Sequence, residues 1–281
     1  MMSTQRTELV NQPRTESKPI LETRSLTRRF RTLTAVDRLS ISVRPGEMFG
    51  LVGPNGAGKT TVIKMLTTIL PPTSGNALVA GHDIVKHAAQ VRSVIGYVPQ
   101  LLSADGSLTG YENLLIFAKL YHIPRSERHS RIRDALTFMG LSEFADKMVR
   151  EYSGGMIRRL EVAESMLHRP RVLFLDEPTV GLDPIARKTV WEHIQRLRSD
   201  YGTTILLTTH YMEEADELCD RVAIMHLGKM AAIGTPAELK VSVGEGATLD
   251  DVFVHYSGYE VDSGGNWREV SSTRRVARRL A

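Results

Sequence analysis

The sequence lacks two features that would place a protein outside the cell or within a membrane. Its 281 residues include a single cysteine, Cys219. One cysteine excludes an internal disulfide framework and agrees with a reducing compartment. No run approaches the roughly 20 apolar residues that a membrane-spanning helix needs, and the polar first residues contain no apolar core of a secretory signal. We therefore expect the protein to fold in the cytoplasm.

The sequence also lacks a strong excess of charge of either sign, and its formal net charge is +4. This mild balance does not call for nucleic acid, and we expect no nucleic-acid partner. Positive charge gathers near both ends of the chain, at Arg24, Arg28, Arg29, Arg31, Arg274, Arg275, Arg278 and Arg279. A basic end can lie against an anionic membrane surface or remain a solvated tail, and the sequence leaves both open.

Short apolar runs rich in β-branched residues alternate with helical patterns over most of the chain. Residues 20–43 carry short apolar runs that end in "LSISV". The predicted strands are the buried run in "RPGEMFGLVG" before the glycine loop, then 94–98, 172–176, 203–209 and 221–225. The predicted helices between or after them are 60–69, 184–200 and 211–218. Apolar runs of this kind are typical of strands buried on both faces. The alternation predicts an α/β fold with a mostly parallel central sheet and an N-terminal β region.

The expected organisation has three parts. Residues 1–19 are polar and contain two prolines, so we expect a disordered segment. The main domain covers 20–241, and within it about 101–168 is helical with no strand candidate, which predicts an all-helical subdomain. Residues 242–281 are rich in Gly and Ser and then basic, which suggests a small extension with a loose tail.

The stretch "GPNGAGKTT" matches the phosphate-loop pattern G-x-x-x-x-G-K-[ST]. It follows a predicted strand and opens a predicted helix, as the pattern requires. Backbone N–H groups of such a loop surround phosphates, the lysine reaches the β- and γ-phosphates, and the hydroxyl after it can hold Mg²⁺. The candidate nucleotide-binding residues are Gly53, Pro54, Asn55, Gly56, Ala57, Gly58, Lys59, Thr60 and Thr61.

Two carboxylates end the apolar run in "RVLFLDEPT". Ligands of open α/β sheets bind at the carboxyl ends of strands. Asp176 is therefore a candidate for the Mg²⁺ shell, and Glu177 for accepting a proton from the attacking water.

The stretch "EYSGGMIRRLEV" places a serine and two glycines in front of an amphipathic helix. Ser153 could simply be a helix N-cap. A helix N-terminus also has spare N–H donors that favour an anion, so a phosphate contact is the second reading.

An Asn-Lys-x-Asp guanine motif is absent, which argues against a GTPase of the Ras type. Five further elements occur in a fixed order: Phe30 in "LTRRF", Gln100 in "GYVPQ", Tyr152 to Met156 in "YSGGM", Asp183 in "GLDP" and His210 in "TTHYMEEAD". Together with the two phosphate-site motifs, this set resembles the ATP-binding subunit of an ABC transporter over about residues 20–240. The resemblance implies a P-loop NTPase fold and Mg·ATP hydrolysis.

The resemblance also implies a role for each matching position. Gln100, with Thr60 and Asp176, contacts Mg²⁺ and the water, Glu177 activates the water, and His210 steadies the γ-phosphate. Phe30 stacks on adenine, although Tyr is commoner there. Ser153, Gly154 and Gly155 contact ATP held by a second copy in a head-to-tail dimer, and Asp183, in the D-loop, is a further nucleotide-binding candidate. The signature ends in Met156 rather than Gln, which leaves the phosphate-contacting residues unchanged.

The longer phrases around these motifs resemble the drug- and antibiotic-resistance exporter branch, whose ATPase pairs with a separate membrane permease. We accordingly expect a peripheral protein at the cytoplasmic face of the membrane that drives efflux of a drug-like or lipid-like compound. The alternative is a non-transport ATPase that acts on a soluble nucleoprotein partner. Permease contact is expected within 101–125, where Tyr111, Leu114, Phe117 and Tyr121 form either a coupling stripe or subdomain core.

Overall fold

The computed structural model describes residues 18–261 and 267–269 of the chain. The N-terminal segment that we expect to be disordered lies outside these residues except for its last two positions. The four arginines of the basic tail lie outside them as well. No helix within the described ranges is long and apolar enough to cross a membrane.

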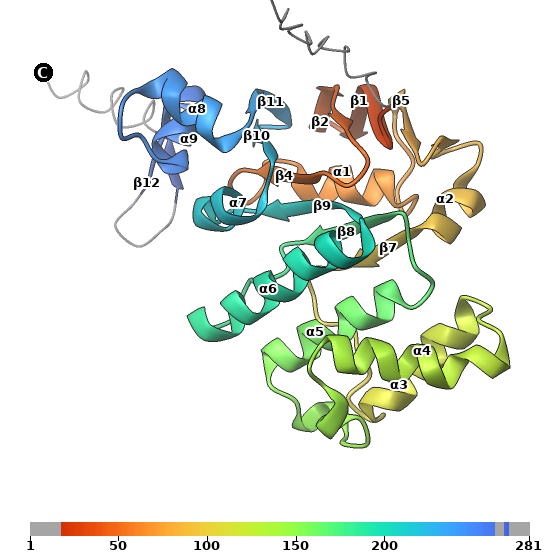
Figure 1. The fold of residues 1–281 in the computed structure, drawn as a ribbon. Helices are drawn as coiled ribbons and strands as arrows, with labels where there is room; N and C mark the ends of the chain where they lie inside the picture. Colours follow the sequence, from red (N-terminus) through yellow and green to blue (C-terminus); the bar gives the residue numbers. More distant parts are fainter. Residues whose placement is uncertain (1–17, 262–266, 270–281) are drawn as a thin grey trace, which may run out of the picture.

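A mostly parallel sheet runs through the middle of the molecule (Figure 1), as predicted. Its order is β11-β10-β4-β9-β8-β7, in which β11 alone pairs antiparallel with its neighbour. The strand bounds are β4 Met48–Val52, β7 Ile95–Val98, β8 Val172–Asp176, β9 Thr204–Thr209, β10 Arg221–His226 and β11 Lys229–Gly234. Residue pairing in the parallel part joins Val52 to Thr209 and Asp176 to Thr208, so these strands end together.

Alternate residues of the central strands enter two separate hydrophobic cores. On β8, for example, Leu173 and Leu175 pack into one core, whereas Val172 and Phe174 pack into the other. All four side chains are fully buried. Burial on both faces explains why these strands read in the sequence as unbroken apolar runs.

The N-terminal β region is an antiparallel sheet in the order β2-β1-β5-β6, with β3 paired to β1. Its bounds are β1 Leu21–Phe30, β2 Leu33–Leu39, β3 Ser42–Val43, β5 Ser74–Val79 and β6 His82–Asp83, and helices α1 Lys59–Leu66 and α2 Ala88–Val94 accompany it. The apolar run "LSISV" is divided between the end of β2 and β3. There, the Thr23 hydroxyl donates to Leu39 O (2.9 Å) and accepts from Ile41 N–H (2.9 Å), beside the backbone hydrogen bond from Thr23 N–H to Ile41 O (2.8 Å).

The segment between β7 and β8 is helical, as predicted, and lies below the central sheet in Figure 1. It comprises α3 Gly110–Leu120, α4 Arg125–Phe138, two short 3₁₀ turns at Ser142–Phe144 and Val149–Glu151, and α5 Gly154–Met166. Leu114 is fully buried, and Tyr111, Phe117 and Tyr121 pack partly buried against the same core. The aromatic stripe is therefore part of the subdomain core.

The described chain after β8 returns to the sheet and continues through two short helices to a two-stranded antiparallel pair. These elements are α6 Pro184–Tyr201, α7 Met212–Leu218, α8 Pro236–Val243, α9 Leu249–Ser257, β12 Tyr259–Val261 and β13 Trp267–Glu269. Helix α8 crosses residue 242, the expected start of the extension. On α9, Leu249, Val252 and Phe253 are buried in the core beneath the sheet. Cys219 is buried too, and a β-carbon at Gly50 would come within 2.9 Å of its sulfur.

Candidate functional site

A cavity of about 560 Å³ opens over the loop between β4 and α1. Its lining includes the predicted Phe30, Pro54, Asn55, Gly56, Ala57, Gly58, Lys59, Thr60, Thr61, Gln100 and Glu177. Gly58 precedes α1 with φ at +105°, and a β-carbon there would lie 2.4 Å from Ala35 O. Only glycine fits such a conformation without strain. The loop is thereby fixed in a shape that brings eight of the nine predicted loop residues to one cavity, with Gly53 just behind it.

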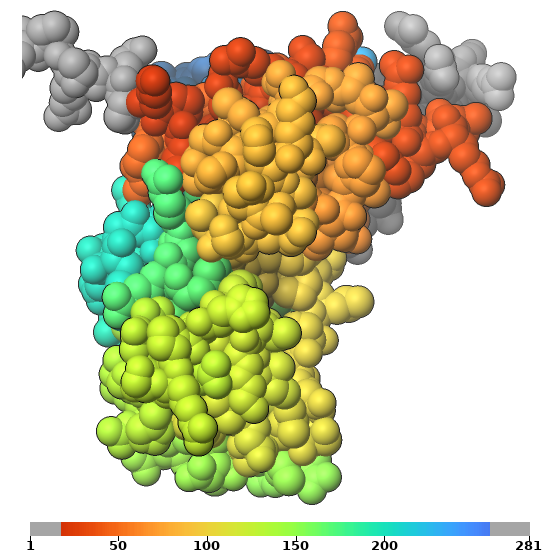
Figure 2. Space-filling model, turned by 90° about the vertical axis from the view of Figure 1, so that its right-hand side faces the viewer, coloured from red at the N-terminus to blue at the C-terminus, as the bar shows by residue number. Residues whose placement is uncertain are grey.

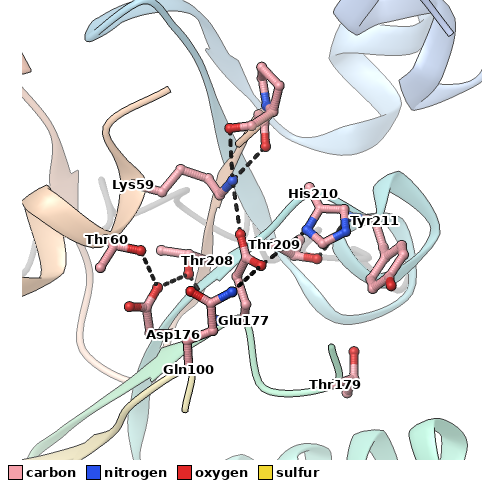
Figure 3. A network of polar contacts seen from close by, with 12 residues as sticks. Lys59, Thr60, Gln100, Asp176, Glu177, Thr179, Thr208, Thr209, His210 and Tyr211 are labelled. Carbon is pink, nitrogen blue, oxygen red and sulfur yellow. Dashed lines mark hydrogen bonds and ion pairs between the residues drawn. The ribbon is translucent and has the colours of Figure 1, made fainter. Parts of the chain in front are cut away.

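Lys59 is buried at the first position of α1 and is held by three acceptors (Figure 3). Its Nζ donates to Gly53 O (2.6 Å) and Pro54 O (3.1 Å), and it lies 3.1 Å from Glu177 Oε1. A buried ammonium needs such partners because its desolvation is costly. The lysine is thus placed at the loop, with its charge directed toward the end of β8.

Glu177 is the first residue after β8, and its backbone is in the left-handed region at φ +49°. This conformation is strained for a residue with a side chain. Its N–H donates to Thr208 O (3.1 Å) and to Thr208 Oγ1 (3.0 Å), which hold the backbone in place. The carboxylate therefore points toward Lys59 rather than along the strand.

Three groups from different elements meet at the Glu177 carboxylate. Gln100 Nε2 donates to Oε2 (3.3 Å), His210 Nδ1 lies 3.1 Å from the same oxygen, and Lys59 faces Oε1. Burial favours the neutral acid, but the hydrogen bond with His210 and the Lys59 ammonium outweigh it and lower the pKa of Glu177. The carboxylate is held ionised, so it can accept a proton.

Asp176, at the end of β8, is buried beside the Thr60 hydroxyl. Its Oδ1 accepts hydrogen bonds from Thr60 Oγ1 (3.1 Å) and Thr208 Oγ1 (2.6 Å). Its Oδ2 is buried and has no hydrogen-bond partner among the described residues. Burial raises the pKa of this carboxyl, against the effect of both hydroxyl donors. An unpartnered carboxylate oxygen next to a hydroxyl suits a hard divalent cation, which binds through oxygen.

Thr208 is a site residue that the sequence reasoning missed. Its hydroxyl donates to Asp176 and accepts from the backbone of Glu177, so it positions both acidic residues. The signal was present, because "TTILLTTH" places hydroxyl groups at the carboxyl end of an apolar strand. A hydroxyl at the carboxyl end of one strand can donate a hydrogen bond to a carboxylate that ends the neighbouring strand.

Phe30 ends β1 at the rim of the same cavity and is 40% exposed. The Arg28 guanidinium lies over its ring at 4.6 Å from the centroid. Leu33 and Leu227, both exposed, also line the cavity and were not predicted. This rim is an apolar patch that can receive a flat base.

The remaining predicted residues lie at two other helix N-termini and do not line this cavity. Ser153 caps α5 by accepting from Met156 N–H (3.3 Å), and Asp183 caps α6 by accepting from Ile185 N–H (3.0 Å) and Ala186 N–H (2.9 Å). Both caps are exposed. A β-carbon at Gly155 would lie 2.9 Å from Ala186 Cβ, so the two helix starts pack closely.

Comparison with known proteins gives consistent matches. A family model described as "ABC transporter" matches residues 36–180. The daunorubicin/doxorubicin resistance ATP-binding protein DrrA of Streptomyces peucetius is 43% identical over 82% of this chain and 69% of that protein. The linearmycin resistance ATP-binding protein LnrL of Bacillus subtilis (strain 168) is 40% identical over 80% of this chain and 72% of that protein. A solved structure described as the ATP-binding subunit of an ABC transporter superposes with a TM-score of 0.75 at 28% identity, covering 84% of this chain and 99% of its own.

Proposed function

The chain belongs to the ABC transporter family, and from that premise we propose that it is the ATP-hydrolysing subunit of an exporter. It drives a drug-like or lipid-like compound out of the cell through a separate membrane permease. The relatives named for daunorubicin and linearmycin resistance support the drug-like class. The observation that carries the enzymatic part is the ionised Glu177 carboxylate between Lys59, Gln100 and His210.

ATP binds in the cavity over the phosphate loop. Its adenine stacks against Phe30, and its phosphates lie in the loop 53–61 at the N-terminus of α1. When ATP binds, Lys59 Nζ donates to the γ-phosphate instead of to Gly53 O and Pro54 O, which are its acceptors in this structure. The ammonium then neutralises charge that develops on the transferred phosphoryl group.

Mg²⁺ fits the oxygen groups on this chain. Thr60 Oγ1, the Gln100 amide oxygen and the unpartnered Asp176 Oδ2 would hold it together with phosphate oxygens. When bound, the ion neutralises phosphate charge and orients the phosphates for attack.

Hydrolysis uses Glu177 as the general base. A water oxygen attacks the γ-phosphorus while the bond to the β,γ-bridging oxygen breaks, which leaves ADP and inorganic phosphate. Glu177 accepts the proton from that water, Gln100 orients the water, and His210 steadies the γ-phosphate. All three side chains already meet at one carboxylate oxygen in this structure.

A second copy completes each site head to tail. Ser153, Gly154, Gly155 and Asp183 do not line their own chain's cavity; Ser153, Gly154 and Asp183 are exposed, and the two helix starts pack closely at the buried Gly155. We assign these helix starts to the ATP bound by the partner copy, because helix N-termini favour phosphate. ATP thus closes the dimer, and hydrolysis opens it.

Contact with the permease uses exposed apolar residues next to the subdomain core, at the cytoplasmic face of the membrane. The aromatic stripe is packed inward, whereas Leu101, Leu102, Ile116 and Leu120 are exposed. Exposed apolar groups in one region are typical of a protein contact.

The test is purification of tagged Glu177→Gln from gently solubilised membranes with Mg·ATP. The variant is expected to bind ATP, turn it over at least a hundredfold more slowly, and retain a multi-span membrane protein in stoichiometric amount. A parallel purification without ATP is the control. Normal turnover would refute the role of Glu177, and recovery of ribosomes or nucleic acid instead of a permease would favour the non-transport alternative.

A further inference from the structure

Arg158 on α5 donates hydrogen bonds to the backbone of the chain where the chain leaves the central sheet. β7 ends at Val98, so the next two carbonyls need donors outside the sheet. Arg158 Nη1 donates to Pro99 O (2.6 Å), and Nη2 donates to Gln100 O (2.7 Å). The side chain is 2% exposed. One rigid guanidinium therefore fixes two consecutive carbonyls at the base of the Gln100 side chain.

A second residue of the same helix holds the other end of this short segment. Glu161 lies 2.9 Å from Arg158 Nη1 and accepts hydrogen bonds from the backbone N–H and the hydroxyl of Ser103. It is as deeply buried as Arg158. We call Arg158 and Glu161 the α5 clasp, because together they hold residues 99–103 against one helical turn.

Packing alone gives no reason for this arrangement. Removing a guanidinium and a carboxylate from water is energetically costly, and apolar residues of similar volume often stabilise such a position as well or better. Arg158 Nε is buried and has no hydrogen-bond partner among the described residues, so the desolvation is only partly offset. The ion pair instead provides directional hydrogen bonds to particular backbone atoms, among them the carbonyl oxygens of Pro99 and Gln100.

The α5 clasp connects the helix that starts at Ser153 with the Gln100 side chain beside Glu177. Helix α5 begins next to Ser153, which we assign to the partner's ATP, and it contacts β7 beneath the sheet (Figure 1). Arg158 holds the Gln100 backbone, and the Gln100 side chain donates to Glu177. In Figure 2 the N-terminal part of the chain and the helical subdomain form an upper and a lower mass of the same face. Residues 99–103 lead from β7 of the central sheet into that subdomain.

We propose that Arg158 is a positioning residue for ATP hydrolysis: it sets the Gln100 amide against Glu177 and couples that contact to the placement of α5. The inference rests on the proposed function and names a residue that the motif comparison does not include. Movement of α5 toward or away from a partner's ATP would carry the Gln100 carbonyl with it, since the hold is bidentate.

Steady-state ATPase kinetics of Arg158→Met, in the natural chain and in a Gln100→Ala background, test the proposal. We expect a loss of about tenfold or more in kcat, with KM for ATP changed by less than about threefold, because misplacement affects the reacting geometry more than binding. In the Gln100→Ala background the same change should cost less than about twofold, because the group through which Arg158 acts is already gone.

Arg159→Met is the matched control. The neighbouring Arg159 donates to Met139 O (2.8 Å) inside the helical subdomain, so its loss should leave kcat within about threefold. If Arg158→Met does not fold, Arg158→Lys is the variant that tests the proposal. Lysine keeps the charge beside Glu161 but cannot donate to both carbonyls in the fixed geometry of a guanidinium, so this variant should also lower kcat.

An unchanged kcat in the folded Arg158 variant, or an equal loss in both backgrounds, would overturn the positioning role. Absence of ATP hydrolysis by the natural chain would instead count against the proposed function. The two failures are therefore distinguishable.

Discussion

Thr208 has one hydroxyl that serves both acidic residues of the site. It donates to Asp176 Oδ1 and accepts from the N–H of Glu177, whose left-handed backbone is held by this contact. Backbone strain of this kind amounts to about 1–3 kcal/mol and persists only where neighbours enforce it. Thr208 itself is fully buried.

Thr208→Val keeps the shape of the side chain and removes this hydroxyl. We expect the free energy of unfolding to fall by about 1–3 kcal/mol, because a buried carboxylate and a buried N–H each lose a partner. ATP turnover should fall by at least tenfold, because Glu177 loses its placement. Urea unfolding and an ATPase assay measure the two effects. Thr189→Val is the control, because that hydroxyl donates only to the helix carbonyl of Ile185 (3.0 Å). Equal results for the two variants would contradict this account.

Glu164 gives the protein a specific pH dependence. Burial, and then the neighbouring Glu161, raise its pKa to about 8, whereas an unfolded chain releases the same proton near pH 4.3. Between these values the folded chain binds a proton that the unfolded chain has lost. The free energy of unfolding therefore falls as pH rises from about 5 to 8.

Glu164→Gln removes this titration while keeping the shape of the side chain. Relative to the natural chain, the variant should gain about 3–4 kcal/mol in free energy of unfolding between pH 5 and pH 8. Urea unfolding at both pH values measures the difference, and the exposed Glu143→Gln serves as a control. Parallel stability curves for the natural chain and Glu164→Gln would show that Glu164 is ionised in the folded state.

Residues that belong to a contiguous motif could be predicted from the sequence. The phosphate loop, Asp176, Glu177, Gln100 and His210 were predicted as one group, and all of them meet at or beside the cavity. Thr208 and Arg158 could not be singled out in the same way. Their partners are remote in the chain, and a threonine in a strand or an arginine on a helix has an ordinary solvated or structural explanation.

At the scale of elements, the start of α5 depends on a close approach to α6. The two glycines before the helix have different surroundings within this one chain. A β-carbon at Gly155 would lie 2.9 Å from Ala186 Cβ, whereas one at Gly154 would meet Leu182 at 3.4 Å. The first distance requires a shift of one helix, and the second is close to ordinary contact.

Gly155→Ala is therefore expected to move α5 away from α6. We predict a loss of about 1–3 kcal/mol in the free energy of unfolding, and a lower turnover because α5 carries both Ser153 and the α5 clasp. Gly154→Ala is the matched control and should lose less than about 1 kcal/mol. Thermal unfolding of both variants measures the difference. If Gly154→Ala proved the more damaging of the two, the packing argument would be wrong.

Helix α9 was not predicted because its composition hides its pattern. The segment after residue 242 is rich in Gly and Ser, which suggested a loose extension. Yet Thr248 and Asp251 form a capping box, and Gly258 ends the helix in the left-handed conformation. Between these signals, Val252 and Phe253 are fully buried. Composition averaged over a window concealed signals that depend on single positions.

At the scale of the whole molecule, the proposed function requires a second copy to complete the site. Ser153 and Asp183 are exposed and do not line their own chain's cavity. Under the proposed function, binding of ATP by one chain and closure of two chains are therefore separable steps. A change at the exposed helix start should affect only the second.

Ser153→Arg tests this separation in the Glu177→Gln background. We expect the affinity of one chain for ATP to change by less than about threefold, because Ser153 is outside the cavity. ATP-dependent dimerisation should be lost, because a bulky cation at the helix N-terminus blocks the partner's phosphate and opposes the helix dipole. Nucleotide binding and light scattering measure the two steps, and Glu177→Gln alone is the control. Continued dimerisation would contradict the assignment of Ser153 to the partner's ATP.

The class of sheet could be predicted from the sequence, but the order of its strands could not. Apolar runs with helices between them are enough for a parallel sheet, and strands at 172–176 and 221–225 were placed closely. In the structure β9 lies between β4 and β8. This order follows from long-range packing of helices on both faces, and spacing along the chain does not encode it.

The burial of Cys219 has a practical consequence for labelling experiments. Its sulfur is enclosed beside Gly50, and burial raises the pKa of the thiol well above its usual value. The reactive thiolate is therefore scarce at neutral pH. A cysteine introduced on the surface, as in Ser126→Cys, would take a maleimide dye in preference to the native thiol. Two singly labelled copies could then report ATP-driven closure by energy transfer, without the need to build a cysteine-free chain first.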